Sequence, residues 1–332
     1  TAVKIEQHYE SPTVHVLDAS RAVGTVATLL DEGRRDDFMV GIRATYAEAR
    51  QRREARSARS DLLSMADARA CAADHDWVNY APPAPAASGV HEFEVPVSEL
   101  RDFIDWTPFF QAWELAGQHP AILDDETVGD AARDLLADAE SLLDEIDASG
   151  AIQARAVIGL FPANAVGDDI DVYEDESRTA VRARLHHLRQ QFSKKGRTAQ
   201  CLADLVAPAD AGKADWVGGF VVTAGLGVAE LVAQEESEQD DYRAILIKSI
   251  ADRLAEALAE YSHAKVRREF WGYAPDESLA SADFIQEAYR GIRPAPGYPA
   301  CPDHTEKGTL FGLLDAERRL GVSLTESFAM TP

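Results

Sequence analysis

The chain has 332 residues, of which 46% are hydrophobic and 27% are charged, a composition typical of a globular protein with a substantial core. Its 33 Lys and Arg residues stand against 57 Asp and Glu residues, and the net charge of −24 repels phosphate backbones, so we expect no nucleic-acid partner. The sequence contains no apolar run of about eighteen residues, which argues against a membrane span.

The cysteines indicate the compartment. Cys71, Cys201 and Cys301 are few, odd in number and widely spaced. This usage fits a reducing environment and argues against a disulfide framework. No secretory leader opens the sequence, so we expect a cytoplasmic protein.

The N-terminal part of the chain is expected to be mostly helical. Residues 2–9 are predicted to form a short extended lead-in. Residues 18–21 supply a cap for an amphipathic helix that stops near Gly33, with apolar side chains at Val23, Val26, Leu29 and Leu30. A second helix is predicted from residue 36 to about residue 58. The proline-rich stretch 74–89 is expected to be a surface loop.

The middle of the chain mixes both kinds of secondary structure. The aromatic cluster at residues 104–110 is expected to close with a short helix. A helix is strongly indicated over residues 127–146, where apolar side chains recur at three- and four-residue intervals: Ala131, Leu135, Leu136, Ala139, Leu142 and Leu143. Strands are predicted at residues 154–160 and 169–173, joined by a loop over residues 161–167.

The C-terminal part continues this mixture. Residues 179–192 are predicted to be helical, residues 216–223 to form a buried strand, and residues 236 to 269 to form the longest helix. Residues 291–303 carry four prolines and are expected to be irregular. Because helices and strands do not alternate regularly, the pattern favours an α+β fold. We expect a single large domain with a mixed or antiparallel central sheet and several long helices.

The segment from Arg293 to Lys307 is the most informative part of the sequence. Its prolines make a stiff ribbon, and Gly297 lets the backbone bend or come close to a ligand. Arg293 offers a planar fork suited to a carboxylate, and Tyr298 offers a ring face and a hydroxyl. These residues indicate either a small-molecule site or a rigid connector with a surface arginine.

Several blocks of the chain resemble the activation domain of cobalamin-dependent methionine synthase. An Arg-x-x-x-Gly-Tyr motif marks that family and stands here at residues 293–298. Five further blocks match in the family's order, at residues 104–110, 159–164, 202–208, 271–275 and 325–330. The resemblance covers nearly the whole chain and implies a C-shaped domain. It also implies that residues 1–15 lead in from a preceding cobalamin-binding domain, and that residues 16–332 form the activation domain, truncated at its C-terminus.

The resemblance also implies a set of residues that bind S-adenosylmethionine. Arg293 would hold the carboxylate of the ligand, the backbone at Ala295 would meet the adenine, and Tyr298 would pack nearby. Asp105 would face the ammonium and sulfonium charges, although the sequence around it taken alone favours a helix cap. Glu256 is a weaker member of the set, since it also fits a solvated helix face. With Gly297, these residues form the predicted cofactor-binding site.

The implied function is reactivation of methionine synthase, a methyltransferase. The domain would position the methyl group of S-adenosylmethionine for reductive methylation of cob(II)alamin. The implied partners are a cobalamin-binding domain on the same polypeptide and an electron donor, either flavodoxin or a flavoprotein reductase. The cobalt-ligating Asp-x-His-x-x-Gly motif is absent from this sequence, so we expect the isolated chain to be inactive by itself.

Two other interpretations remain open at the level of sequence. The chain could be a non-catalytic module that binds S-adenosylmethionine or docks a cobalamin domain. Alternatively, Cys301 and His304 could be half of a metal site, although no second pair has suitable spacing. His186 and His187 are predicted to lie within a helix on different faces, which is poor for chelation.

Overall fold

The computed structural model describes residues 1–16, 19–57, 62–192 and 198–331. The chain forms two compact units, the first made of Thr1–Cys71 with Gln190–Ala199 and the second of Ala72–Arg189 with Gln200–Pro332. The sequence predicted one large domain beginning at residue 16. That boundary stays a prediction, whereas the residues up to Cys71 form a unit of their own.

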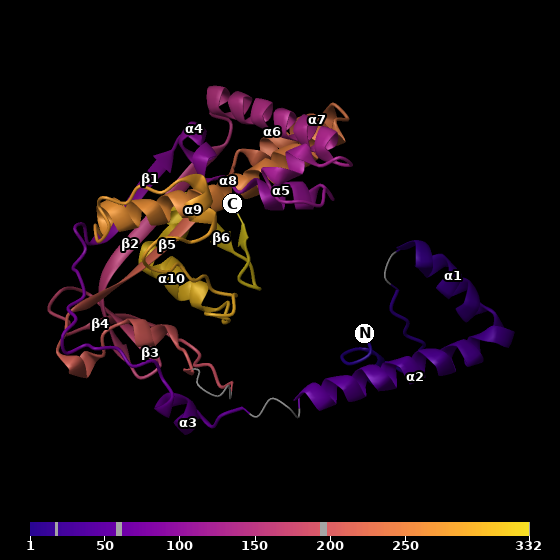
Figure 1. Cartoon of the computed structure of the whole chain (residues 1–332), viewed down its shortest axis with the longest axis horizontal. Coiled ribbons are helices and arrows are strands. Elements are labelled where there is room, and N and C mark those ends of the chain that lie inside the picture. Colours follow the sequence, from indigo (N-terminus) through magenta and orange to yellow (C-terminus); the bar gives the residue numbers. More distant parts are fainter. Residues whose placement is uncertain (17–18, 58–61, 193–197, 332) are drawn as a thin grey trace. The chain divides into compact units, whose positions relative to one another are not determined.

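The first unit is helical (Figure 1). Its first element is a single 3-10 turn, η1 (Glu6–His8), so the extended lead-in predicted for residues 2–9 is wrong there. The helices α1 (Ala19–Leu30) and α2 (Glu32–Ser57) confirm the two predicted helices. The expected cap residue Asp18 and the expected end at Ala58 lie outside the described residues.

Side chains of α2 fasten the start of the chain to this helix. Arg50 pairs with Glu6 at 2.8 Å and donates a second hydrogen bond to the carbonyl of Ala2 at 3.0 Å. The short helix α3 (Met65–Ala70) ends the unit's main segment, and Ser64 caps it by accepting from the backbone N–H of Asp67.

An antiparallel sheet organises the second unit. Its five strands are β1 (Gly89–Val95), β2 (Gln153–Val166), β3 (Asp169–Tyr173), β4 (Val181–Leu185) and β5 (Asp215–Leu226). They follow the order β1-β2-β3-β4, and β5 pairs with β2. The long central strand β2 therefore carries β1 and β3 along one edge and β5 along the other (Figure 1). This confirms the predicted α+β class with an antiparallel central sheet.

Three strand predictions need correction. The loop predicted at residues 161–167 is the second half of β2, where Phe161 and Ala163 are buried and only Gly167 and Asp168 turn the chain. The helix predicted at residues 179–192 contains strand β4 instead. Strand β1 was not predicted at all.

Cross-strand contacts explain β4. Ala183 and Leu185 pack towards the apolar cores. Between them, Arg184 donates to both carboxylate oxygens of Asp171 on β3, at 2.5 and 3.0 Å. This alternation has the period of two that a strand requires.

Long helices cover one end of the sheet. These are α6 (Gly129–Ser149), α7 (Val228–Ser237) and α8 (Asp241–Lys265), and α8 continues into a π-helical turn, η6 (Val266–Phe270). The single helix predicted from residue 236 to 269 is therefore two helices. The break lies at Gln239, which has a φ of 64°, and Asp240 then caps α8 by accepting from the N–H of Arg243 at 2.9 Å.

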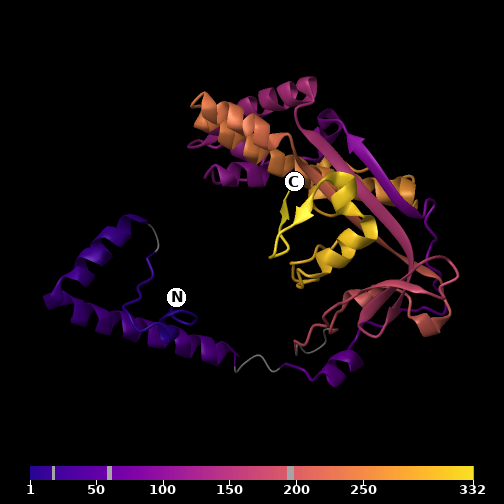
Figure 2. The same cartoon turned by 180° about the vertical axis from the view of Figure 1, so that it is seen from behind.

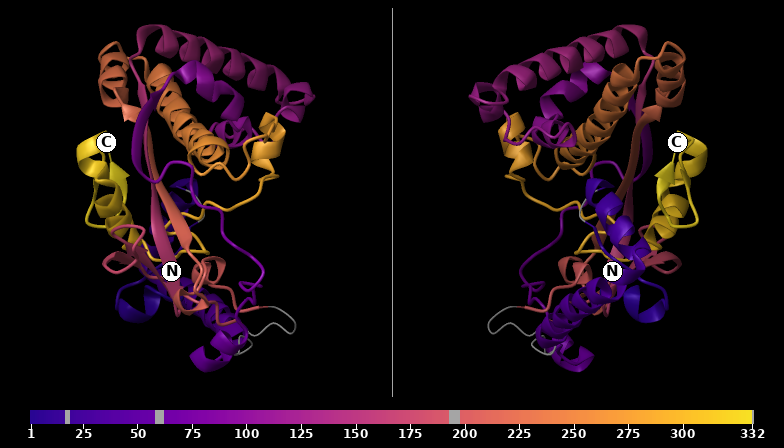
Figure 3. Two further views of the ribbon diagram at one scale, coloured as in Figure 1. Left: turned by 90° about the vertical axis from the view of Figure 1, so that its left-hand side faces the viewer. Right: turned by 90° about the vertical axis from the view of Figure 1, so that its right-hand side faces the viewer.

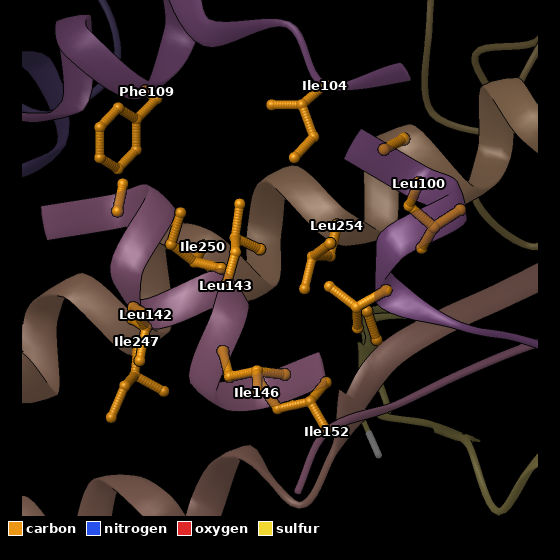
Figure 4. Packing of buried hydrophobic residues seen from close by; sticks show 14 of the residues in the cluster. Leu100, Ile104, Phe109, Leu142, Leu143, Ile146, Ile152, Ile247, Ile250 and Leu254 are labelled. Atoms are coloured by element: carbon orange, nitrogen blue, oxygen red, sulfur yellow. The ribbon is translucent and has the colours of Figure 1, made fainter. Parts of the chain in front are cut away.

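The main core lies between α6, α8 and the adjoining end of the sheet. Apolar side chains of both helices point into this common space, as Figure 4 shows for Leu142, Leu143, Ile146, Ile247, Ile250 and Leu254. Phe109, from α5 (Trp106–Ala112), also packs there. Each fully buried side chain of this size contributes about 1.5–3 kcal/mol to stability. This packing fixes α8, which carries much of the site described below.

The two faces of the sheet carry different elements. Ile158 and Leu160 face Val266 of η6, whereas Val157 and Phe161 face Leu314. Leu314 belongs to α10 (Glu306–Leu314), which α11 (Ala316–Leu320) follows. The views in Figures 2 and 3 show this C-terminal part, in yellow, on one face of the sheet, with α8 in orange beyond the other.

Small elements complete the second unit. They are α4 (Val97–Leu100), η2 (Arg101–Phe103), η3 (Ala121–Asp124), η4 (Leu202–Leu205), η5 (Ala209–Ala211), α9 (Ser281–Ile285), β6 (Ser323–Leu324) and β7 (Met330–Thr331). None of the helices in the described part of the chain combines the length and apolarity that a bilayer crossing requires.

Candidate functional site

The ribbon that carries Arg293 is irregular, as predicted. Its bend lies at Gly297, which has a φ of 103° and whose N–H donates to the carbonyl of Cys301 at 2.7 Å. A Cβ atom at this position would lie 2.3 Å from the ring of His304, so the bend requires glycine. The surrounding prolines stiffen the segment. The ribbon thus holds Arg293 in a defined position.

Arg293 points to helix α8, where its Nη2 donates to Oε1 of Glu260. The side chains are 28% and 14% exposed, respectively, so the pair is shielded but reachable from solvent. Nε of Arg293 and Oε2 of Glu260 are buried without a hydrogen-bond partner. Burial acts to lower the pKa of Arg293, but the charge of Glu260 and the hydroxyl of Tyr289 outweigh it. The guanidinium therefore stays charged.

Helix α8 and the π-helical turn η6 that continues it present a stripe of polar side chains towards this arginine. Glu256, Glu260, His263 and Arg267 follow one another at spacings of four, three and four residues, so they share one helix face. Glu256 lies at the solvent end of the stripe, 65% exposed, and pairs with Arg253 at 2.8 Å. The stripe becomes more buried towards Arg267, which is fully enclosed.

The buried end of the stripe is packed around Tyr289. Arg267 lies over the Tyr289 ring with its Cζ atom 4.1 Å from the centroid, and His263 meets that ring edge to face at 5.0 Å. Glu277 neutralises Arg267. Burial lowers the pKa of His263 to about 3, and the charges of Arg267 and Arg293 act in the same direction. His263 is therefore neutral around pH 7, and its buried Nδ1 has no partner.

Asp105 is placed as a helix cap. Its Oδ1 accepts a hydrogen bond from the N–H of Thr107 at 2.9 Å at the start of α5, and the side chain is half-buried. The cap interpretation is therefore confirmed, and the role of Asp105 towards a ligand stays a prediction. In the described residues no contact joins Asp105 to Arg293.

The other predicted residues lie on the exposed side of the ribbon. Ala295 is exposed, and its carbonyl accepts from the N–H of Tyr298 at 3.3 Å. The Tyr298 side chain is 68% exposed. The structure thus brings Arg293 to the helix face that Glu256 begins, while Ala295 and Tyr298 remain open to solvent.

Sequence reasoning missed the inner part of this cluster, namely Glu260, His263, Arg267, Glu277 and Tyr289. The polar stripe along the helix did not mark them, because polar residues at helical spacing ordinarily form the solvated face of an amphipathic helix. Nothing in the sequence joined that stripe to Arg293, which lies 33 positions beyond Glu260.

The metal interpretation gains no support from the described residues, in which no group of three His, Cys, Asp or Glu side chains is placed to hold an ion. The sulfur of Cys301 lies 4.0 Å from Nδ1 of His187, and His304 packs against Gly297. The prediction that His186 and His187 lie within a helix is wrong, since both follow strand β4.

Comparison with known proteins adds to this geometry. Residues 96–332 match the family model of the vitamin B12-dependent methionine synthase activation domain. The chain is also similar to a crystal structure of the MetH reactivation domain bound to AdoHcy, with 52% sequence identity and a TM-score of 0.80. That match covers 82% of this chain and 83% of the other. Both findings confirm the family resemblance and the fold expected from the sequence motifs. The chain therefore belongs to the activation-domain family of vitamin B12-dependent methionine synthase.

Proposed function

We propose that this chain binds S-adenosylmethionine and positions its methyl group for reductive methylation of cobalamin carried by a neighbouring domain. The family membership supports the reactivation role. The similar crystal structure binds AdoHcy, which is S-adenosylmethionine without its transferable methyl group. The observation that carries the proposal is the shielded guanidinium of Arg293, whose buried Nε has no hydrogen-bond partner.

In this proposal the residues of the chain bind and orient the ligand. Arg293 pairs with its carboxylate through charge-assisted hydrogen bonds. Asp105 faces the positive ammonium and sulfonium groups, Glu256 adds negative charge on the same side, and the ribbon at Ala295, Gly297 and Tyr298 receives the adenosine. No acid or base is required, because the sulfonium is already an activated methyl donor. Holding the methyl group in line with its acceptor supplies the rate advantage of an intramolecular reaction.

The methyl acceptor lies outside this chain in the proposal. Cobalamin, reduced by one electron from flavodoxin or a flavoprotein reductase, supplies the nucleophile for the sulfonium methyl group, and the electrons of the broken C–S bond stay on sulfur. We place the cobalamin-binding domain on the same polypeptide, joined to this chain through residues 1–15. The free thiols of all three cysteines support a reducing, cytoplasmic setting.

Calorimetric titration of the chain with S-adenosylhomocysteine tests the binding proposal. We expect saturable binding with one site per chain, and a rise in the thermal midpoint as ligand is added, because the ligand binds only the folded state. At a hundredfold excess over Kd the stabilisation is about 2.7 kcal/mol. An unchanged midpoint at millimolar ligand, with no heat of binding, would contradict the proposal.

A further inference from the structure

Two arginine–glutamate pairs lie side by side in the site, and they differ in completeness. Arg267 donates to Glu277 from Nε, at 3.0 and 2.9 Å to the two oxygens, and from Nη2 at 2.6 Å. Arg293 donates to Glu260 through Nη2 alone. The remaining atoms of that edge, Nε of Arg293 and Oε2 of Glu260, are buried without partners. The guanidinium edge that faces the glutamate is fully bonded in the first pair and half bonded in the second, and Nη1 of Arg267, outside that edge, is also buried without a partner.

The incompletely bonded pair is also the more exposed of the two. Arg267 is fully buried and Glu277 is 10% exposed, so a ligand cannot reach between them. Arg293 is 28% exposed. A carboxylate that approaches Arg293 therefore meets a partly exposed guanidinium, one edge of which is already engaged by Glu260 through Nη2.

The two arginines of the cluster are neutralised before any ligand is added. Arg267 pairs with Glu277 and Arg293 with Glu260, His263 carries no charge, and Glu287 adds negative charge that acts on Glu260. A ligand carboxylate on Arg293 would add a further negative charge close to Glu260. Like charges that lie close together in a shielded site repel strongly. The carboxylates of Glu260 and of the ligand therefore cannot both bind Arg293 favourably.

We propose that Glu260 is an internal competitor for Arg293, which the ligand carboxylate must displace, so that Glu260 limits the affinity of the chain for carboxylate-bearing ligands. This inference rests on the proposed function, in which Arg293 receives the carboxylate of S-adenosylmethionine. In the exchange, the hydrogen bond from Nη2 to Oε1 of Glu260 breaks and the guanidinium bonds to the ligand instead.

A proton accompanies the exchange. Burial raises the pKa of Glu260, and the negative charge of Glu287 raises it further. The positive charges of Arg293 and, to a smaller extent, Arg267 oppose this rise. Once the ligand carboxylate neutralises Arg293, Glu260 loses its main stabilising charge and takes up a proton from solvent. The other ionisable groups facing this place are Tyr289 and His263, and both are neutral around pH 7.

The first test compares wild type with Glu260→Gln, which removes the charge and keeps the shape. The probe is S-adenosylhomocysteine, titrated by calorimetry. We expect Glu260→Gln to tighten binding about tenfold, equivalent to about 1.4 kcal/mol. Glu269→Gln is the matched control, because Glu269 is 56% exposed and pairs with Lys265 away from Arg293. We expect this variant to bind S-adenosylhomocysteine with the affinity of wild type. Equal or weaker binding by Glu260→Gln would overturn the proposal.

A second ligand isolates the carboxylate. 5′-Methylthioadenosine keeps the adenosine and the thioether and lacks the amino-acid group. Its affinity is expected to be the same for wild type and Glu260→Gln. A tenfold gain for this ligand as well would show a general change of the site and would overturn the competition.

The third measurement needs no variant. Titrations of wild type with S-adenosylhomocysteine in two buffers of different ionisation enthalpy are expected to show proton uptake, with affinity falling as the pH rises. No proton uptake and a flat pH profile would overturn the exchange and leave the proposed function standing. Failure of wild type to bind S-adenosylhomocysteine at all would overturn both.

Discussion

Arg267 and Glu277 form a closed ion pair inside the second unit, with Nε and Nη2 of the arginine engaging the carboxylate. Arg267 is fully enclosed, so removal of its partner leaves a buried charge without compensation. We expect Glu277→Ala to lower the free energy of unfolding by about 3–5 kcal/mol, measured by denaturant titration. Removing the exposed partner in Lys265–Glu269 should cost about 0–1 kcal/mol. A loss of that small size for Glu277→Ala would show that the pair is not structural.

Arg293 is expected to behave differently from Arg267, because in the proposed function it binds the carboxylate of the ligand. Arg293→Ala should weaken binding of S-adenosylhomocysteine by about ten- to a hundredfold, the value of one charge-assisted pair. Arg293→Lys should recover only part of that loss, since an ammonium cannot offer a planar fork. Calorimetry on the three proteins measures this. Equal affinity for wild type and Arg293→Ala would remove Arg293 from the site.

The ribbon that positions Arg293 depends on Gly297. An added Cβ would lie 2.3 Å from the His304 ring, and the φ of 103° is unfavourable for any other residue. We expect Gly297→Ala to cost about 1–3 kcal/mol of stability and to weaken binding of S-adenosylhomocysteine several-fold, because the bend must open. Gly312→Ala is the control, since nothing lies within 4 Å of a Cβ there. Unchanged stability and affinity for Gly297→Ala would show that the bend is dispensable.

His263 makes stability depend on pH. Its pKa is about 3 in the folded chain, because burial and then the charges of Arg267 and Arg293 lower it from the model-compound value of 6.5. At pH values between these two pKa values, the unfolded chain binds a proton on this histidine and the folded chain does not. The free energy of unfolding therefore falls as the pH falls through this range. The slope contributed is at most about 1.4 kcal/mol per pH unit. Denaturant titrations from about pH 7 to about pH 5 should show a shallower slope for His263→Gln than for wild type. Parallel slopes would contradict this account.

Local patterns predicted much of the fold. Helix α6 carries its apolar residues at a period of 3.6, β5 carries a short apolar run, and both elements lie where the sequence indicated. The second half of β2 was missed because Pro162 and Asn164 are typical of loops. The fold compensates by burying the Asn164 amide, which donates to the carbonyls of Ala207 and Lys213 at 2.9 Å.

The outer site residues could be predicted, and the inner ones could not. Arg293 and Gly297 lie within one short motif, so their positions in the chain were enough to find them. The role of Glu260 follows only from its contact with Arg293, which lies 33 positions further along the chain. Such contacts depend on how α8 packs against the core, and one sequence does not specify that packing.

Methyl transfer tests the central claim most directly. S-adenosylmethionine labelled in its methyl group is incubated with this chain, a reductant, and either free cobalamin or a separately produced cobalamin-binding domain. We expect label on cobalamin only with the domain, and only when this chain is present, because docking of the domain on this chain brings its cobalamin to the methyl group, which free cobalamin cannot do. Transfer to free cobalamin at the same rate, with no gain from the domain, would contradict the account and indicate a self-sufficient methyltransferase.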